Sequence, residues 1–388
     1  MSSLTGTSFN PAISRRSIIA GIAGLGAAGV LAGCSDGASS GSGSSGSAFM
    51  IGGIGPTTGS AAIYGNACKN GAQIAIDEIN AEGGDVQFEL NFQDDESDAE
   101  RSVNAYNNLK DWGMQILVGA TTSTPCVAVS SETNADNLFQ LTPSGSSTDV
   151  IGGQPDADGN IAEPRKENVF QMCFTDPNQG AASAQYISEQ QLGTKIAIIY
   201  NNSDTYSTGI YQSFKTEAAE YGLEIVFLPI YYTPISLILT QANQMGYAPK
   251  WFGVDGMDGL LTVKGFDTAL AEGCMLLTPF VATATDEATQ AFVSKYEEDY
   301  GETPNQFAAD SYDCIYALKA AIEQAGVTAD MDFSDICDAL VEVFTSSDFS
   351  YTGLTTAGEA ATWSDTGEIS KQPMGMVIQG GVYMPLDA

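Results

Sequence analysis

The sequence contains no histidine. This absence excludes Ser-His-Asp and Cys-His catalytic systems and every metal site with a histidine ligand, while catalysis by carboxylates alone stays open. Basic residues are scarce as well, with 14 Lys plus Arg against 48 Asp plus Glu and a net charge of −34. So acidic a chain is not expected to bind nucleic acid or to adsorb electrostatically to anionic lipid. We attribute the acidity to solubility or salt adaptation rather than to a functional acidic patch.

Long apolar runs are also missing, because the run at residues 18–32 is rich in Gly and Ala and too short for a comfortable membrane span. It follows Arg15 and Arg16, as in a twin-arginine export signal, and it ends in Leu-Ala-Gly-Cys34, which resembles a lipobox. We predict a signal peptide at 1–33, a lipidated Cys34 and a flexible Gly/Ser tether to residue 48. A free cysteine after an ordinary signal peptide is the alternative.

Cysteine is infrequent, and no two of the seven residues form a CxxC motif. Redox and zinc roles therefore lack support. With Cys34 used for lipid, six cysteines remain, and an exported chain could pair them in about fifteen ways. Cys173 and Cys274 each lie near a predicted crossover between domains, so this pair is one candidate disulfide.

The 388 residues are enough for two domains, and the stretch 49–95 shows their building unit. An apolar run at 49–54 is followed by a Gly/Pro/Thr/Ser turn, a helical pattern at 66–81 and a second strand at 86–92. Such β-α-β units build open α/β sheets that bind ligands at the carboxyl ends of their strands. Further helices are predicted at 99–112, 126–135, 179–191, 206–221, 235–245, 287–300, 305–325 and 333–345. Further strands are predicted at 114–118, 138–141, 169–173, 195–200, 251–254, 275–279 and 373–385.

Three hydroxyl-rich loops follow strands of this predicted sheet, at 55–60, 119–125 and 142–147. Since parallel strands end at the same edge, the three loops are expected to share one site. Hydroxyls and the free N–H groups at helix starts suit a carboxylate or another small anion. Asp94 and Asp95 also follow a strand, but neighbours on a strand point oppositely, so we interpret them as solvated loop acids rather than an acid/base pair.

The motif IGGIGPTTGSAAIYGNACKNGAQIAIDEINAEGG, followed by FQDDESDAERSVNAYNNL, resembles the start of the branched-chain amino acid (Leu/Ile/Val) type of ABC-transporter substrate-binding protein. The resemblance extends from about residue 49 to about 386. It implies an α/β type I periplasmic-binding-protein fold, with two doubly wound Rossmann-like lobes joined by a multi-strand hinge. The predicted lobes are 49–172 plus 281–371 for lobe 1 and 173–280 plus 372–388 for lobe 2.

The sequence departs from this family near residue 226. Relatives have a strand, a helix and another strand between the segments that resemble 222–226 and 227–232, whereas here the two segments are joined directly. We therefore expect one β-α unit to be missing from lobe 2. Loss of such a unit would leave an open sheet edge and an uncovered face.

A free amino acid brings a carboxylate, an ammonium and a side chain, and a dry crevice must satisfy all three. By resemblance, the carboxylate and part of the ammonium are held by Ser123, Ser144, Gly145 and Ser146. Asp255 matches the acidic position that pairs with the ammonium, although an ordinary turn before Gly256 is the alternative. Aromatic positions that wall the crevice correspond to Tyr64, Tyr206, Tyr231 and Phe307, for each of which core packing is the alternative.

Together these features predict a non-catalytic, lipid-anchored solute receptor on the outer face of the cytoplasmic membrane. It would bind a small aliphatic amino acid, without cofactor or metal, and deliver it to a permease with cytoplasmic ATPase subunits. A sensory ectodomain for amino acids, amides or urea-like solutes that signals through a partner subunit is the second hypothesis. An enzyme, such as a carboxylate hydrolase, is the third, and the missing histidines count against it.

Overall fold

A computed structural model of the chain describes residues 47–154, 161, 163–192, 195–221 and 224–386. The predicted signal peptide, Cys34 and nearly all of the tether lie outside these residues. None of the described helices is both long enough and apolar enough to cross a membrane.

The first sheet is parallel throughout and has the strand order β2-β1-β3-β4-β5. Its strands are β1 (Phe49–Gly55), β2 (Phe88–Asp94), β3 (Ile116–Gly119), β4 (Phe139–Thr142) and β5 (Val169–Gln171). The helices that alternate with them are α1 (Ala62–Glu82), α2 (Ala99–Trp112), α3 (Ser123–Asp136) and α4 (Thr148–Ile151). Three later helices join them, namely α8 (Glu287–Tyr300), α9 (Gln306–Ala325) and α10 (Phe333–Phe344). We call this sheet and its helices lobe 1.

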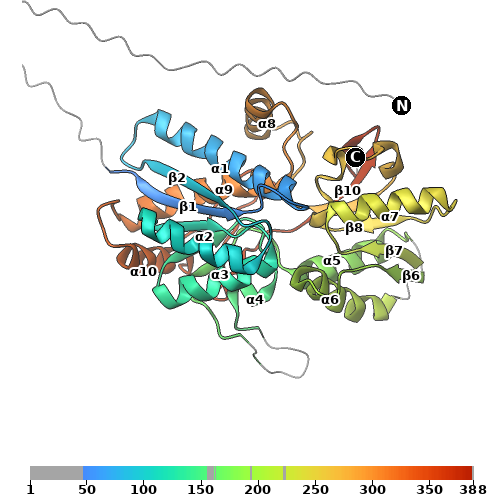
Figure 1. The fold of residues 1–388 in the computed structure, drawn as a ribbon, viewed down its shortest axis with the longest axis horizontal. Helices are drawn as coiled ribbons and strands as arrows, with labels where there is room; N and C mark the ends of the chain where they lie inside the picture. The colour runs from blue at the N-terminus through green and yellow to red at the C-terminus, as the bar shows by residue number, and fades with distance from the viewer. Residues whose placement is uncertain (1–46, 155–160, 162, 193–194, 222–223, 387–388) are drawn as a thin grey trace, which may run out of the picture. The chain divides into compact units, whose positions relative to one another are not determined.

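Alternation of side chains along β1 explains how lobe 1 is layered. Phe49 and Ile51 pack in one core cluster with α1, α9 and α10, while Ile54 packs in another with α2 and α3 (Figure 1). Along the chain, β2 is added on one side of β1, and β3, β4 and β5 are then added on its other side. Because the direction of addition reverses between β1 and β3, α1 and α3 lie on opposite faces of the sheet. This reversal point, at the carboxyl ends of β1 and β3, is where open α/β sheets bind ligands.

The second sheet is mixed and has the order β11-β10-β9-β8-β7-β6. β6 (Lys195–Ile198), β7 (Glu224–Leu228), β8 (Trp251–Gly253) and β9 (Met275–Thr278) are parallel to one another. β10 (Met374–Gln379) and β11 (Val382–Pro385) form an antiparallel hairpin, and β10 runs antiparallel to β9. This sheet and its helices, α5 (Asp176–Glu189), α6 (Thr205–Tyr221) and α7 (Tyr232–Gln244), are called lobe 2.

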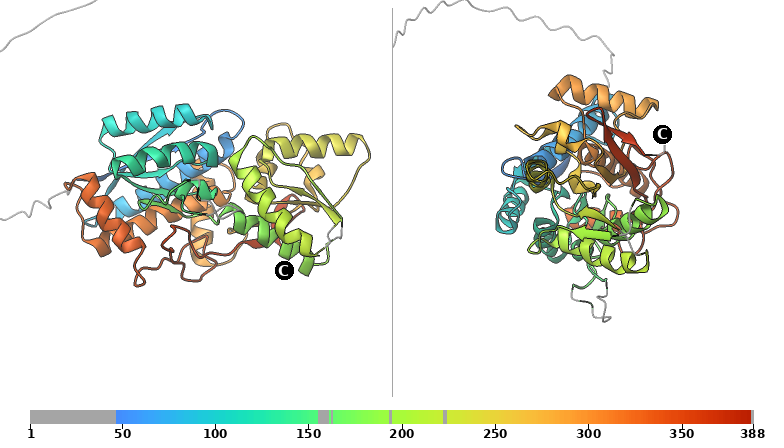
Figure 2. Two further views of the ribbon diagram at one scale, coloured as in Figure 1. Left: turned by 90° about the horizontal axis from the view of Figure 1, so that it is seen from below. Right: turned by 90° about the vertical axis from the view of Figure 1, so that its right-hand side faces the viewer.

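The helices of lobe 2 lie on both faces of its sheet. Phe227 and Phe252 pack against α5 and α6, whereas Val226 and Leu228 pack against α7 on the other face. Figure 2 shows α7 on the opposite side of the sheet from α5 and α6. The chain passes between the two sheets three times: after β5, after β9 and before β10. Several short connections of this kind form a hinge, about which two lobes can close around a ligand.

The direct connection in the sequence between the segments 222–226 and 227–232 has a clear consequence for the second sheet. β7 is a single strand that pairs with both β6 and β8, so β6 lies at the end of the strand order. Next to this edge the side chain of Ile199 is 41% exposed. Six strands and helices on both faces remain, so lobe 2 still provides a second wall for a site.

Most predicted elements occur, with ends shifted by a few residues. The helices predicted at 99–112 and 287–300 have those bounds in the structure. The final strand region predicted at 373–385 consists of two strands, because Gly380 and Gly381 turn the chain and produce the β10–β11 hairpin. The candidate disulfide is absent from the described residues, in which Cys173, Cys274 and the other four cysteines are free and buried.

Candidate functional site

Two loops of lobe 1 form the hydroxyl-rich wall of a small pocket. They leave the neighbouring parallel strands β3 and β4 at the same edge of the sheet. Ser144 Oγ donates a hydrogen bond to the Thr121 carbonyl oxygen at 2.6 Å, and the Ser147 N–H donates to Ser123 Oγ at 3.3 Å. Ser123 begins α3, and its N-cap residue Thr122 makes no side-chain capping hydrogen bond. The wall therefore offers hydroxyls and helix-start N–H groups, a combination that suits a carboxylate.

Lobe 2 provides the acidic wall. Asp255 follows β8 at the start of a short 3-10 helix, Asp255–Met257, and is 4% exposed. Its Oδ1 accepts a hydrogen bond from the Tyr206 hydroxyl, and its Oδ2 accepts one from Gln179 Nε2 at 3.2 Å. Burial raises the pKa of Asp255 to about 7, against the opposing effect of these hydrogen bonds. A nearby ammonium would favour the ionised carboxylate, so this wall suits the amino end of a zwitterion.

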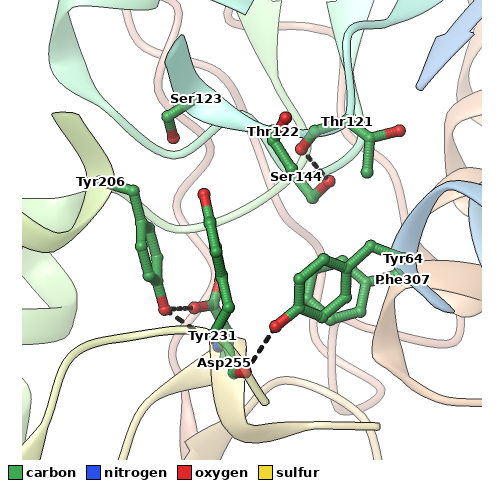
Figure 3. A pocket seen from close by; sticks show the side chains of 10 residues that line it. Tyr64, Thr121, Thr122, Ser123, Ser144, Tyr206, Tyr231, Asp255 and Phe307 are labelled. Atoms are coloured by element: carbon green, nitrogen blue, oxygen red, sulfur yellow. Dashed lines mark hydrogen bonds between the residues drawn. The ribbon is translucent and has the colours of Figure 1, made fainter. Parts of the chain in front are cut away.

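Aromatic rings occupy the space between the two walls (Figure 3). Tyr64 from α1 and Phe307 from α9 lie together with ring centroids 4.3 Å apart. On the side of lobe 2, Tyr206 and Tyr231 stack with centroids 4.9 Å apart and an interplanar angle of 12°. The Tyr64 hydroxyl donates to the Gly256 carbonyl oxygen, which links the two lobes directly beside Asp255.

Further hydrogen bonds join the lobes at the rim of the pocket. On one side, Thr233 Oγ1 donates to the Ser60 carbonyl oxygen at 2.9 Å, and the Ile63 N–H donates to the Tyr232 hydroxyl at 3.1 Å. On the other side, Thr124 Oγ1 lies 3.4 Å from Asp204 Oδ1. The structure is therefore a closed form, in which the two lobes contact each other around the pocket.

Seven of the nine site residues expected from the sequence line this pocket: Tyr64, Ser123, Ser144, Tyr206, Tyr231, Asp255 and Phe307. Gly145 and Ser146 are not among the lining residues. Gly145 packs against Cys126, whose Sγ would lie 2.7 Å from an added Cβ, and Ser146 is fully buried, with its side chain next to the Asp176 carboxylate. The sequence analysis missed three lining residues, namely Thr121, Thr122 and Gly256. Thr121 and Thr122 lie in the hydroxyl-rich loop at 119–125, and Gly256 directly follows Asp255.

Two acids near the site have partners that the sequence did not reveal. Asp95 is fully buried, so its interpretation as a solvated loop acid is wrong; its carboxylate accepts hydrogen bonds from Ser102 Oγ at 2.6 Å and from the Ser97 N–H at 2.9 Å. Asp310, one turn after Phe307, forms a buried ion pair with Lys371. Lys371 lies in the last passage between the lobes, so this pair ties α9 to the hinge. Among the described residues, no cluster of acids and cysteines could hold a metal ion.

Two α/β lobes joined by three short passages, with a small pocket between a hydroxyl wall and an acidic wall, define a two-lobed solute receptor. The chain belongs to the periplasmic binding protein family, whose model matches residues 49–237 and 230–344. This is a family of extracytoplasmic binding receptors and not a class of enzymes.

Relatives and solved structures agree with this assignment. The chain is 27% identical over 312 residues to the Leu/Ile/Val-binding protein BraC3 of Rhizobium johnstonii, covering 73% of this chain and 81% of the relative. It is 23% identical over 301 residues to the leucine-, isoleucine-, valine-, threonine- and alanine-binding protein of Pseudomonas aeruginosa, covering 70% and 77% of the two chains. The isoleucine complex of the branched-chain amino acid transporter substrate-binding protein LivJ from Streptococcus pneumoniae has the same fold, with a TM-score of 0.74, 23% identity and coverage of 87% and 98%.

The fold also occurs with other ligands. A solute-binding protein from R. palustris in complex with benzoate matches with a TM-score of 0.71 and 16% identity, over 88% of this chain and 96% of that one. At such identities the likeness establishes the fold, and the ligand has to be argued from the residues of the pocket.

Proposed function

We propose that this protein is the extracytoplasmic solute receptor of an ABC importer and that it binds a small aliphatic amino acid between its lobes. The observation that carries the proposal is the opposition of Ser123 and Ser144 to Asp255 across one pocket. A carboxylate and an ammonium on one small molecule satisfy both walls at once. A carboxylate alone, as in an aromatic acid, would leave the negative charge of Asp255 without a countercharge in a dry site.

The proposed ligand contacts are divided between the lobes. Ser123 and Ser144, with the first N–H groups of α3, hold the carboxylate. Asp255, oriented by Tyr206 and Gln179, accepts the ammonium. Tyr64, Tyr206, Tyr231 and Phe307 surround the aliphatic part. The names of the amino acid-binding relatives support this class of ligand.

We further propose that the mature protein is anchored by lipid on Cys34 and hands its ligand to a permease with cytoplasmic ATPase subunits. The closed form supports delivery, because a permease can distinguish a closed receptor from an open one. For the anchor, Cys34→Ser should move the protein from the membrane fraction to the soluble fraction of fractionated cells. An unchanged membrane fraction would contradict lipidation at this residue.

The ligand is tested by thermal unfolding of protein that has been unfolded, dialysed and refolded to remove bound solutes. A panel of L-amino acids, simple amides and benzoate is added at increasing concentration. An aliphatic amino acid should raise the unfolding midpoint in a dose-dependent way, while its amide and the corresponding acid without an amino group should not. A midpoint raised by amides or benzoate and by no amino acid would refute the proposal.

A further inference from the structure

Tyr231 lies across the pocket rather than at its edge. It is the N-cap residue of α7, and its ring is stacked on Tyr206 and meets Tyr64 edge-on, with centroids 5.4 Å apart and an interplanar angle of 64°. Its hydroxyl points away from Asp255 toward the loop that carries Ser123 (Figure 3). The ring thus extends along the line that joins the two walls of the site.

Little room remains beside this ring. Within the pocket, the volume that the centre of a water molecule can occupy is about 10 Å³, which corresponds to roughly one water molecule. An amino acid is larger than this space. It can enter only if the lobes separate or if one of the lining side chains moves.

The other aromatic hydroxyls are tied to the protein. The Tyr64 hydroxyl donates to the Gly256 carbonyl oxygen and accepts from the Tyr232 N–H at 3.3 Å. The Tyr206 hydroxyl donates to Asp255 and accepts from the Gly256 N–H at 2.9 Å. Tyr231 is held by ring contacts and by a hydrogen bond between its hydroxyl and the Ser123 backbone, on the hydroxyl wall. Of the three tyrosines that line the pocket, Tyr231 is therefore the one that can move without breaking hydrogen bonds to the acidic wall.

The position of Tyr231 also determines which part of a ligand it meets. A zwitterion that spans Ser123 and Asp255 must lie alongside the ring, and its side chain must then fit between Tyr231 and the Tyr64–Phe307 pair. The centroid separation of 5.4 Å between Tyr231 and Tyr64 leaves no gap for a branched side chain. A methyl or hydroxymethyl group requires a smaller displacement of the ring than a branched side chain does.

We propose that Tyr231 sets the size of the ligand and that this receptor favours amino acids with short side chains, such as alanine, over leucine and isoleucine. The inference rests on the proposed function and narrows it. It separates this chain from relatives whose names specify leucine, isoleucine and valine. Leucine binds only when the Tyr231 ring is displaced from its stack on Tyr206, which lowers its affinity relative to alanine.

The test is calorimetry of L-alanine and L-leucine with the ligand-stripped mature protein and three variants. The wild type should bind alanine at least tenfold more tightly than leucine. Tyr231→Ala removes the ring and should shift the ratio of the two dissociation constants toward leucine by at least fivefold. Tyr231→Phe keeps the ring and should keep the ratio within fivefold of wild type, whatever its absolute affinities.

If Tyr231→Ala does not fold, as judged by its circular dichroism melt, Tyr231→Leu takes its place. The ratio of the two dissociation constants should then shift toward leucine by the same amount. The inference is overturned if the wild type fails to bind alanine at least tenfold more tightly than leucine. It is equally overturned if the ring-deleting variant shifts the ratio by less than fivefold or if Tyr231→Phe shifts it by more. A wild type that binds neither these nor any other free amino acid would instead refute the proposed function itself.

Discussion

Replacement of Asp255 by asparagine tests the acidic wall with the least change in shape. The amide keeps an oxygen that can accept the hydrogen bond from the Tyr206 hydroxyl, but it removes the negative charge opposite the hydroxyl loops. Asp255 is buried, so a ligand ammonium facing it is shielded from water. Truncating one partner of such a buried, hydrogen-bonded charge pair costs about 2–5 kcal/mol. The dissociation constant of the amino acid should therefore rise by about 30-fold to several thousand-fold.

The pH dependence of binding provides a second measure of the same group. In the ligand-free protein burial raises the pKa of Asp255 to about 7. The ligand ammonium favours the ionised carboxylate, so binding releases a proton from Asp255 at acidic pH, and the affinity should rise with pH until it levels off above about pH 7. Between pH 5 and pH 8 the association constant of the amino acid should rise by roughly a hundredfold, because it changes about tenfold for each pH unit below the pKa of Asp255. The Asp255→Asn protein should lack this dependence.

Calorimetry at pH 5, 6, 7 and 8 measures both effects with one ligand, the amino acid that most stabilises the wild type. Asp286→Asn is the matched control, because it removes an exposed carboxylate at the start of α8 that does not line the pocket and should change the affinity by less than about threefold. A loss of less than tenfold in Asp255→Asn, or a flat pH profile in the wild type, would show that the ammonium is held elsewhere.

Three further outcomes follow from the described contacts. Ser144→Ala should weaken binding of the amino acid by about 1.5–3 kcal/mol in calorimetry, because Ser144 lines the pocket and its hydroxyl lies beside the Thr121 carbonyl oxygen in the hydroxyl wall; an unchanged affinity would contradict its role. Burial raises the pKa values of Asp255 and Asp258 to about 7 and 6. The stability that these two acids contribute in their protonated forms is fully present below the unfolded pKa near 3.9 and is lost as pH rises through 6–7. The melting temperature of ligand-free protein should accordingly fall between pH 5 and pH 8, and a rise would refute the assignment. Lys371→Met should lower the free energy of unfolding in urea by about 3–5 kcal/mol by leaving Asp310 unpaired, and adding Asp310→Asn should recover part of this loss.

Local sequence determined much of the secondary structure. The helix at Ala99–Trp112 has its N-cap in Asp98, whose side chain accepts from the Arg101 N–H, and it ends at Gly113 with a positive φ. These signals involve residues within a few positions of one another, so they can be recognised without the fold. The meeting of the loops after β3 and β4 was predictable for a similar reason, because strands of one parallel sheet end at the same edge, whereas the loop at 55–60, expected to share the site, contributes no residue to the pocket lining.

Only the tertiary structure decided which side chains meet. Asp310 and Lys371 are 61 residues apart, and Tyr64 and Gly256 are 192 apart, yet each pair shares a buried hydrogen bond. Periodicity identifies a buried face of a helix but does not identify its partner, since the partner depends on how the chain passes between the lobes. The orientation of Tyr231 across the pocket is of this kind. The spacing of residues thus predicted the β-α units and a polar site, and the family resemblance implied the two lobes, while the room left for a ligand was set by packing across the two lobes.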